Sequence, residues 1–465
     1  MRELSDTIAA VATPRGVGGI GIVRVSGPNA LAIAEKLTGR GVGEWEPQRA
    51  TVCEVFALDD REVPLDQAVV TYFRGPRSYT GEDVVEIACH GGLLVVRRVL
   101  EECLRAGARL AEPGEFTRRA FLNGKLDLTQ VEAVAGIVHA RSEAGLRAAV
   151  RQLQGNLSRP LRELRNDLLE IATRVELELD FAEEDVELAP REEIRARVVR
   201  ARDVVRRGLA SYSRGRRLWE GVRVVIAGRP NVGKSSLLNA LVGAERAIVT
   251  EVPGTTRDTI EAELSLNGVL FRLVDTAGLR QAADKVEVLG IDRTWREVER
   301  ADVVLWVIDA SAGLEEAVGE EGEALKRGAA SCGADLIVVL NKVDLEPRIE
   351  PGQLRPHVGG LRVVEVSAKT GAGLGALESA LLETVEGKDD AGGQEWLVTS
   401  ERQFQALVRA GEALDRCLAC LDRGYGYEVV AVELREAMEA VGSVVGEVTT
   451  EDILNEIFAR FCIGK

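Results

Sequence analysis

The sequence is poor in the residues on which several kinds of chemistry depend. Histidine occurs only three times in 465 residues, at His90, His139 and His357, and these positions lie far apart in the chain. A histidine-rich metal site or a histidine-activated nucleophile is therefore not expected. The chain also lacks an uninterrupted apolar run of about 18 residues, so it predicts no segment that spans a membrane.

Cysteine is scarce as well. The seven cysteines are an odd number, and the chain opens without the pattern of a signal peptide, which predicts reduced thiols in the cytoplasm. Cys417 and Cys420 have the CxxC spacing of a metal-ligand pair, but no second CxxC accompanies them. They fall within a helical pattern, so we expect two residues near the apolar face of a helix rather than a zinc site.

Positive charge is in deficit. Lysine and arginine total 59 against 75 for aspartate and glutamate, a formal net charge of −16. This excludes a protein coated in positive charge, so any contact with nucleic acid must come from a local basic face. The most basic segment is 191–217. Its ordinary interpretation is a solvated helix face, and a nucleic-acid surface is the alternative.

Four stretches of different pattern follow one another, and an apolar content of 46% lets them form sizeable cores. Residues 1–120 mix short Val- and Ile-rich runs with Gly and Pro, which predicts an α+β domain. Residues 121–220 repeat apolar positions at helical spacing. Residues 221–384 alternate apolar strands with helices, which predicts a parallel sheet covered on both faces. Residues 385–465 are helical again, so a discontinuous α-helical domain holds an inserted α/β domain.

A phosphate-binding motif follows the first strand of the inserted domain. GRPNVGKS, Gly228–Ser235, matches GxxxxGK[ST], with an apolar strand before it and a helical pattern after it. The glycines let backbone N–H groups turn toward phosphate oxygens, and the helix N-terminus favours negative charge. We expect Lys234 to reach the β- and γ-phosphates and the Ser235 hydroxyl to bind Mg²⁺.

Further motifs, in the order that a GTPase requires, follow the phosphate loop. TEVPGTTRD carries Thr256, a candidate Mg²⁺ ligand, and DTAG carries Asp275 for the water shell of the metal and Gly278 for the γ-phosphate. NKVD ends in Asp344, whose carboxylate can accept two hydrogen bonds that guanine offers and adenine does not. SAK, Ser367–Lys369, is expected to bring a backbone N–H to the guanine O6. The candidate GTP-binding residues are Asn231, Val232, Gly233, Lys234, Ser235, Ser236, Thr250, Glu251, Val252, Pro253, Gly254, Thr255, Thr256, Asp275, Thr276, Ala277, Gly278, Asn341, Lys342, Asp344, Ser367, Ala368 and Lys369.

Two positions alter the expected mechanism of hydrolysis. Leu279 follows DTAG, where Ras-like enzymes have a glutamine that orients the attacking water. Leucine cannot polarise water, so the orienting group must lie elsewhere. Asn231 in the phosphate loop indicates a monovalent cation, which could supply the positive charge that an arginine finger provides in other GTPases.

A second glycine motif lies near the N-terminus. GVGGIG at 16–21 matches GxGxxG, but it precedes a strand-like run instead of joining a strand to a helix. It therefore fails the context that dinucleotide binding needs, and we interpret it as a set of turn glycines.

The chain as a whole resembles the MnmE (TrmE) family of tRNA modification GTPases. Outside the GTPase motifs the similarity is carried by DTIAAVATPRGVGGIGIVRVSG, SYTGEDVVEIACHGG and PGEFTRRAFLNGKLDLTQVEA, by DTAGLRQAADKVEVLGIDR in the switch region, and by the C-terminal FCIGK. The resemblance implies a multidomain fold: an α+β N-terminal folate-binding-type domain at 1–120 that also dimerises, a discontinuous α-helical domain at 121–220 and 385–465, and an inserted α/β P-loop GTPase domain at 221–384.

The resemblance also implies cofactors and partners. Members of this family form a homodimer and work with MnmG, a protein that uses FAD and NADH. Together they add an aminomethyl or carboxymethylaminomethyl group to the wobble uridine of certain tRNAs. A formyl- or methylene-tetrahydrofolate is the implied one-carbon donor, and K⁺ is implied to stimulate GTP hydrolysis.

Site residues of the family carry over to positions of this chain. The implied catalytic acid is Glu287, which would orient the attacking water. The implied ligands are, for K⁺, Asn231, Thr250, Val252 and Thr255; for Mg²⁺, Ser235 and Thr256; and for folate, Arg24, Glu86, Lys125 and Lys465. The folate set is chemically sensible, because the glutamate tail of folate pairs with cations and the donors of its pterin pair with a carboxylate.

The C-terminal cysteine has two further interpretations. CIGK has the outline of a prenylation box, but Gly464 and Lys465 fit one poorly and no polybasic stretch precedes it. The resemblance places Cys462 near the folate site, where either a chemical role or simple packing is open.

Two other functions agree with part of the sequence. A regulatory or ribosome-assembly GTPase that acts as a binding switch would carry the same GTPase motifs, and the folate-type N-terminal domain and FCIGK argue against it. A folate-dependent transferase without a GTP cycle is disfavoured, because the phosphate and guanine motifs are all intact.

Overall fold

The computed structural model describes residues 6–180, 190–243, 261–275, 295–386, 396–459 and 461–465. The chain divides into two compact units. The first contains Met1–Ala135, Gln152–Arg202 and Ala406–Lys465, and the second contains Gly136–Arg151 and Asp203–Gln405. Each unit has its own cores of buried apolar side chains.

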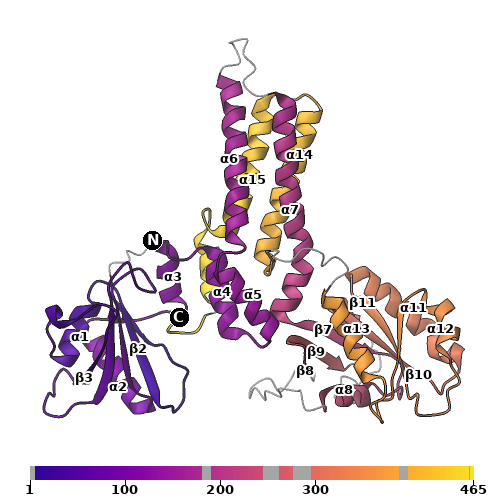
Figure 1. Ribbon diagram of the computed structural model, residues 1–465, viewed down its shortest axis with the longest axis horizontal. Helices are drawn as coiled ribbons and strands as arrows, with labels where there is room; N and C mark the ends of the chain where they lie inside the picture. The colour runs from indigo at the N-terminus through magenta and orange to yellow at the C-terminus, as the bar shows by residue number, and fades with distance from the viewer. Residues whose placement is uncertain (1–5, 181–189, 244–260, 276–294, 387–395, 460) are drawn as a thin grey trace. The chain divides into compact units, whose positions relative to one another are not determined.

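The first unit begins with a six-stranded sheet in the order β3-β4-β5-β2-β1-β6. Neighbouring strands are antiparallel, except that β1 and β6 are parallel. Buried and less buried positions alternate along β4, because one face of the sheet packs on α1 and α2 (Figure 1), and the α+β prediction is confirmed. The elements are β1 (Ile8–Val11), β2 (Ile20–Ser26), α1 (Ala30–Thr38), the 3-10 helix η1 (Val42–Glu44), β3 (Ala50–Val55), β4 (Asp66–Phe73), β5 (Val84–His90), α2 (Leu93–Arg105), β6 (Arg109–Leu110) and α3 (Glu115–Leu122).

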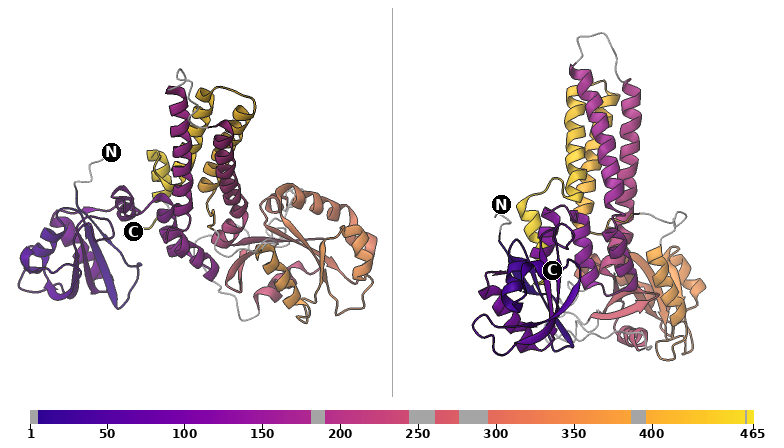
Figure 2. Two further views of the ribbon diagram at one scale, coloured as in Figure 1. Left: turned by 45° about the horizontal axis from the view of Figure 1, so that its top comes forward. Right: turned by 60° about the vertical axis from the view of Figure 1, so that its left-hand side comes forward.

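Long helices make up the rest of the first unit. α6 and α15 pack along each other, and Figures 1 and 2 show the first part of α7 and the later part of α14 beside them. A separate core joins α4 to α16. Among the described helices, none is both long and apolar enough to cross a membrane. The helices that lie wholly or partly in this unit are α4 (Leu128–His139), α6 (Ser158–Asp180), α7 (Arg191–Glu220), α14 (Glu401–Asp422), α15 (Tyr427–Val445) and α16 (Glu451–Phe458), whereas α5 (Glu143–Leu153) lies almost entirely in the second unit.

The arginine-rich segment is engaged within this bundle. Arg191 donates a hydrogen bond to the carbonyl oxygen of Leu421 at 2.9 Å, and Arg195 forms an ion pair with Asp422 at 2.7 Å. These side chains hold the start of α7 against the end of α14. Arg195 is still 42% exposed, so this end of the segment is a partly solvated helix face, and the nucleic-acid surface stays a prediction.

The CxxC pair lies in the interior of α14. Cys417 and Cys420 are both buried, and burial raises the pKa of the Cys417 thiol to about 12. The prediction of two apolar-face helix residues is confirmed, because each cysteine packs in this bundle as a small apolar side chain.

The second unit is built around another six-stranded sheet, in the order β12-β11-β10-β7-β9-β8. All neighbours in it are parallel except β8 and β9. Val303–Ile308 of β10 are all buried, as expected of a strand covered on both faces. One core lies toward α8 and α13 and the other toward α11 and α12, so the predicted two-sided parallel sheet is confirmed. The elements are β7 (Val222–Ala227), α8 (Lys234–Val242), β8 (Glu261–Leu266), β9 (Val269–Asp275), β10 (Val303–Asp309), α11 (Leu314–Cys332), β11 (Asp335–Asn341), α12 (Pro351–Val358), β12 (Arg362–Glu365) and α13 (Leu374–Glu386).

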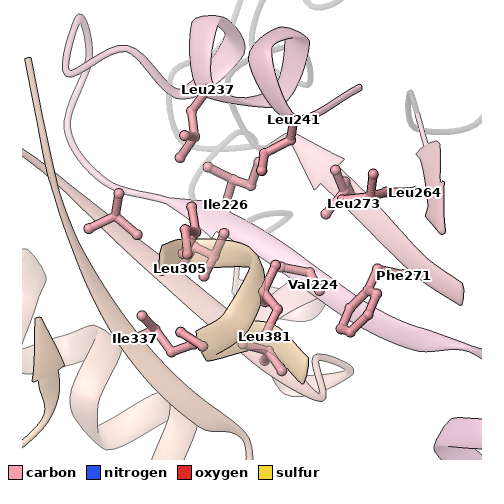
Figure 3. Close-up of a cluster of buried hydrophobic side chains, with 14 of the residues drawn as sticks. Val224, Ile226, Leu237, Leu241, Leu264, Phe271, Leu273, Leu305, Ile337 and Leu381 are labelled. Atoms are coloured by element: carbon pink, nitrogen blue, oxygen red, sulfur yellow. The ribbon is translucent and has the colours of Figure 1, made fainter. Parts of the chain in front are cut away.

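One core of the second unit supports the phosphate-loop motif. Figure 3 shows Val224 and Ile226 of β7 beneath Leu237 and Leu241 of α8, with Leu381 of α13 on the same side of the sheet. These side chains are buried on both elements that flank the loop. The strand and the helix are thereby fixed relative to each other, and so are the two ends of the loop.

Strand β8 is not one of the apolar runs from which the strands of this domain are predicted. Its sequence, EAELSL, alternates polar with apolar residues, and it forms the sheet edge by pairing antiparallel with β9. The two-residue turn between these strands has positive φ angles at Asn267 (47°) and Gly268 (79°), as a tight hairpin turn requires. The formation of this edge strand thus depends more on the residues of the turn than on an apolar run within the strand.

Candidate functional sites

The phosphate loop has the backbone conformation that its glycines permit. A side chain at Gly228 would clash with the carbonyl oxygen of Val307 on β10, so β10 leaves room only for glycine. Asn231 and Gly233 adopt positive φ angles of 64° and 98°, and α8 begins at the next residue, Lys234. The strand–loop–helix arrangement predicted from GRPNVGKS is therefore present.

Lys234 lies against the loop that precedes it. Its side chain is buried, and its Nζ donates to the carbonyl oxygens of Gly228 and Arg229, each at 2.7 Å. The ammonium group is thus enclosed by the motif, where it can meet phosphate oxygens.

Two oxygen ligands suited to a divalent cation meet at the start of α8. The Ser235 hydroxyl donates to Asp275 Oδ2 at 2.6 Å. Asp275 ends β9, which pairs in parallel with β7, and it is 5% exposed. Hydroxyl and carboxylate oxygens are ligands that Mg²⁺ prefers, directly or through water, so these residues fit the predicted metal.

The motifs assigned to guanine converge on Asn341. Its side chain is 1% exposed; its Nδ2 donates to the carbonyl oxygen of Val232 at 2.9 Å, and its Oδ1 accepts from the Ala368 N–H at 3.1 Å. The Ser367 hydroxyl donates to Asp344 Oδ1 at 2.6 Å. Three segments that are remote in sequence are therefore joined at one place, with the carboxylate of Asp344 exposed beside them.

Asp309 belongs to this site although sequence reasoning missed it. Lys342 Nζ donates to Asp309 Oδ2 at 2.6 Å and to the carbonyl oxygen of Asn231 at 2.7 Å. Burial by itself raises the pKa of Asp309, but hydrogen bonds from Lys342 and Ser311 outweigh it, so the pKa is lowered. The carboxylate therefore stays charged and fixes Lys342 over the phosphate loop.

Several predicted residues lie outside the described ranges. They include the predicted catalytic acid, most of the predicted K⁺ ligands and one predicted Mg²⁺ ligand. The residues are Thr250, Glu251, Val252, Pro253, Gly254, Thr255, Thr256, Thr276, Ala277, Gly278 and Glu287. Leu279 lies outside them as well.

A second group of predicted residues meets in the first unit around Arg24. This side chain of β2 donates from Nε to Glu86 Oε1 on β5 at 2.8 Å. Its guanidinium lies over the rings of Tyr79 and Phe116, at 5.5 and 5.6 Å from the ring centroids. Sequence reasoning missed both aromatic residues: Tyr79 lies in a loop, which has no periodic signal, and Phe116 is a buried residue near the start of α3. The ion pair and the two rings fix the orientation of Arg24.

The C-terminal segment completes this group. Arg24 Nη1 donates to the carbonyl oxygen of Gly464 at 3.2 Å. Burial lowers the pKa of Lys465, as does the nearby charge of Arg24, while Glu86 raises it. Arg24, Glu86 and Lys465 are therefore brought together as the family resemblance implied.

Gly464 is required for this placement. Its φ angle is 101°, and a side chain there would clash with the carbonyl oxygen of Val11 on β1. Cys462 is exposed, and its carbonyl oxygen accepts from the Gly114 N–H at 3.5 Å. The glycine thus lets the tail lie against the sheet, with the Cys462 thiol left accessible.

Lys125 lies on a neighbouring loop. Its Nζ donates to the carbonyl oxygen of Pro76 at 3.0 Å, and its side chain passes beside Gly81. The loop between β4 and β5, which contains Pro76 and Gly81, also carries Tyr79, which contacts Arg24. Lys125 is therefore connected to the group around Arg24 through this loop, and no hydrogen bond or ion pair between described residues joins it to Arg24 directly.

The GVGGIG segment lies between β1 and β2, two strands that pair antiparallel, and its last two residues begin β2. It does not connect a strand to a helix, so the context that a dinucleotide fingerprint needs is lacking there. Gly16, with a φ angle of 148°, agrees with the interpretation as a turn glycine, whereas Gly21 lies within β2.

Comparison with known proteins gives matches along nearly the whole chain. Two protein-family models match it, "GTP-binding protein TrmE N-terminus" over residues 7–125 and "MnmE helical domain" over residues 128–462. A protein named tRNA modification GTPase MnmE from Symbiobacterium thermophilum is 48% identical over 465 residues, which cover 99% of each chain. A protein of the same name from Chlorobium luteolum is 45% identical, and the match covers 98% of this chain and 97% of that protein. Another, from Heliobacterium modesticaldum, is also 45% identical, and the match covers 99% of this chain and 100% of that protein.

Proposed function

The chain belongs to the MnmE (TrmE) family of tRNA modification GTPases, and we propose that its GTP hydrolysis serves one reaction: addition of an aminomethyl or carboxymethylaminomethyl group to the wobble uridine of certain tRNAs. In this proposal the chain acts in the cytoplasm as a homodimer with an MnmG-type partner that uses FAD and NADH. A formyl- or methylene-tetrahydrofolate bound to the N-terminal domain supplies the carbon.

The convergence on Asn341 is the observation that carries the GTP assignment. It joins the phosphate loop, through Val232, to the SAK segment, through Ala368. In the proposed complex the Asp344 carboxylate accepts hydrogen bonds from guanine, and Ser367 holds that carboxylate in place. Lys234 neutralises phosphate charge at the other end of the same site.

Two cations complete the proposed hydrolytic site. Mg²⁺ would be held by Ser235 and Thr256 with Asp275 on its water shell, and K⁺ by Asn231, Thr250, Val252 and Thr255. These ions supply positive charge to the phosphate oxygens as negative charge develops on them. Support for the Mg²⁺ position comes from the contact between Ser235 and Asp275. We assign the orientation of the attacking water to Glu287.

The group around Arg24 supports a folate site. Arg24 and Lys465 are cations for the carboxylates of the glutamate tail, and Glu86 is an acceptor for pterin donors. Because the aromatic rings and Glu86 fix Arg24, its guanidinium can present two donors to one carboxylate without a large entropic cost. Lys125 would reach the ligand from the adjoining loop.

Mass spectrometry of wobble nucleosides tests this function. Cells that lack the chain should lose the modified wobble uridines, and the wild-type gene should restore them. Asp344→Asn should fail to restore them, while the purified variant should hydrolyse xanthosine triphosphate, because an amide can donate to the oxygen that replaces the guanine amine. Unaltered wobble nucleosides in the deletion strain would refute the tRNA assignment. Undiminished use of GTP by Asp344→Asn would refute the guanine assignment.

A further inference from the structure

A single hairpin connects two segments that carry GTP-binding motifs. In sequence β8 follows TEVPGTTRD, and β9 ends at Asp275, the first residue of DTAG. The Asp275 carboxylate in turn accepts the hydrogen bond from Ser235. A displacement of the hairpin along its strands therefore moves Asp275, the described residue at which DTAG begins.

The opposite end of this hairpin is held by residues Gly136–Arg151, which comprise the end of α4, most of α5 and the residues between them, and which we call the α4–α5 connection. At the turn, the Ala144 N–H donates to the carbonyl oxygen of Gly268 at 2.9 Å. Along β8, Arg141 Nη1 donates to Glu263 Oε1 at 2.7 Å. Because a Cβ atom at Gly268 would lie only 3.1 Å from Glu143 Cβ, the approach is as close as a glycine permits.

The same connection packs against the end of α7. A side chain at Gly136 would overlap the indole of Trp219, and one at Gly145 would lie 2.8 Å from the carbonyl oxygen of Leu218. Glycine at both positions lets the backbones approach. Residues Gly136–Arg151 accordingly belong to the compact unit of the GTPase sheet, although the residues before and after them in sequence belong to the first unit.

We propose that the α4–α5 connection senses the bound nucleotide through the β8–β9 hairpin and relays its state to the helices with which it is continuous. From Val269 to Asp275, β9 covers about 20 Å at roughly 3.3 Å per residue, and it is paired on both sides, so it forms a continuous link between the hairpin turn and Asp275. This inference rests on nucleotide binding by the GTPase domain and is independent of the tRNA, folate and K⁺ assignments.

The contact is suited to a switch because it is small. It consists of one backbone hydrogen bond and one partly exposed ion pair, with Arg141 53% and Glu263 21% exposed. An interaction of this kind contributes little free energy by itself. A nucleotide that contacts one end of the hairpin differently in its di- and triphosphate forms can therefore shift the equilibrium of the contact at the other end.

Hydrogen exchange in the full-length chain tests the proposal. The amide of Ala144 is the reporter, because its partner is the hairpin turn itself. We expect peptides covering 137–151 to exchange at rates that differ by about fivefold between saturating GDP and a saturating non-hydrolysable GTP analogue, as the loss of one surface contact allows. Saturation is verified first by titration, so that a failure to bind guanine nucleotides, which would count against the proposed function, is recognised separately. Equal exchange rates in the two complexes would overturn the relay.

Three variants assign the effect to the ion pair. Arg141→Glu opposes two carboxylates and should remove the nucleotide-dependent difference, whereas Arg141→Lys keeps the charge and should retain it. The matched control is Arg147→Glu, which removes an ion pair with Glu143 within α5 and leaves Glu263 untouched. We expect the control to keep the difference. A difference that persists in Arg141→Glu, or one that disappears equally in the control, would overturn the role of Arg141.

Discussion

Replacement of Asn341 by alanine tests whether one buried amide organises the nucleotide site. The side chain is 1% exposed and makes two hydrogen bonds, to the Val232 carbonyl and from the Ala368 N–H. Alanine leaves both partners without their bond. An unsatisfied buried polar group costs about 1–3 kcal/mol, and a bond at a part-buried position contributes about 0.5–1.5 kcal/mol. The free energy that holds the site together therefore falls by about 1.5–4.5 kcal/mol.

Part of this loss should appear in nucleotide affinity. Without Asn341, GTP has to order the phosphate loop and the SAK segment as it binds. If about 2 kcal/mol of the loss falls on binding, Kd rises about 30-fold. GDP should be affected to a similar extent, because both of the joined segments are proposed to contact the part that the two nucleotides share.

Calorimetric titration of the full-length variant with GDP and a GTP analogue measures the effect. Asn239→Ala is the matched control, because Asn239 is an exposed residue of α8 in the same domain. Its affinity for nucleotide should stay at the wild-type value. Thermal unfolding of both variants separates a loss of affinity from a loss of folding. A folded Asn341→Ala protein with a Kd within about twofold of wild type would refute the reasoning, since RT ln 2 is far below the expected loss.

Further outcomes are expected at both sites. Gly464→Ala should displace the C-terminal tail, because its φ angle is 101° and Val11 blocks a side chain; folate affinity by fluorescence should fall about tenfold, with GTP affinity unchanged. Glu287→Ala should abolish GTP hydrolysis in a phosphate-release assay yet keep GTP affinity near normal, and a large loss of affinity would instead indicate a structural role. GTP turnover should be higher in K⁺ than in Na⁺, and equal rates would remove the K⁺ assignment.

Much of the nucleotide site could be predicted because its residues lie at the ends of strands. The motif GRPNVGKS sits between an apolar run and a helical pattern, so its strand, loop and helix follow from local sequence. The buried runs of β10 and β11 indicate a parallel sheet in the same way. Carboxyl ends of parallel strands meet at one edge, which places Asn341 near the phosphate loop.

The contacts that were missed depend on register and on turns. Asp309 ends β10 directly opposite Asn341 of β11, so aligning the strand ends would have placed it beside the NKVD motif. The position of β8 depends on the hairpin turn at Asn267 and Gly268, and its sequence has no apolar run that would predict a strand. Long-range pairs of this kind become visible only when the fold brings their elements together.

The site around Arg24 shows the same limit more strongly. Its members come from β2, from β5, from α3, from the loop that carries Tyr79 and from the last residues of the chain. Arg24 contacts each of them with a different part of its guanidinium. Nε pairs with Glu86, Nη1 donates a hydrogen bond to Gly464, and the planar face stacks on the aromatic rings. Lysine offers neither the planar face nor the fixed fork of donors, so it could not replace arginine at this position. Because the Gly464 carbonyl and Lys465 arrive from the C-terminus, the N-terminal sheet by itself does not contain the complete site.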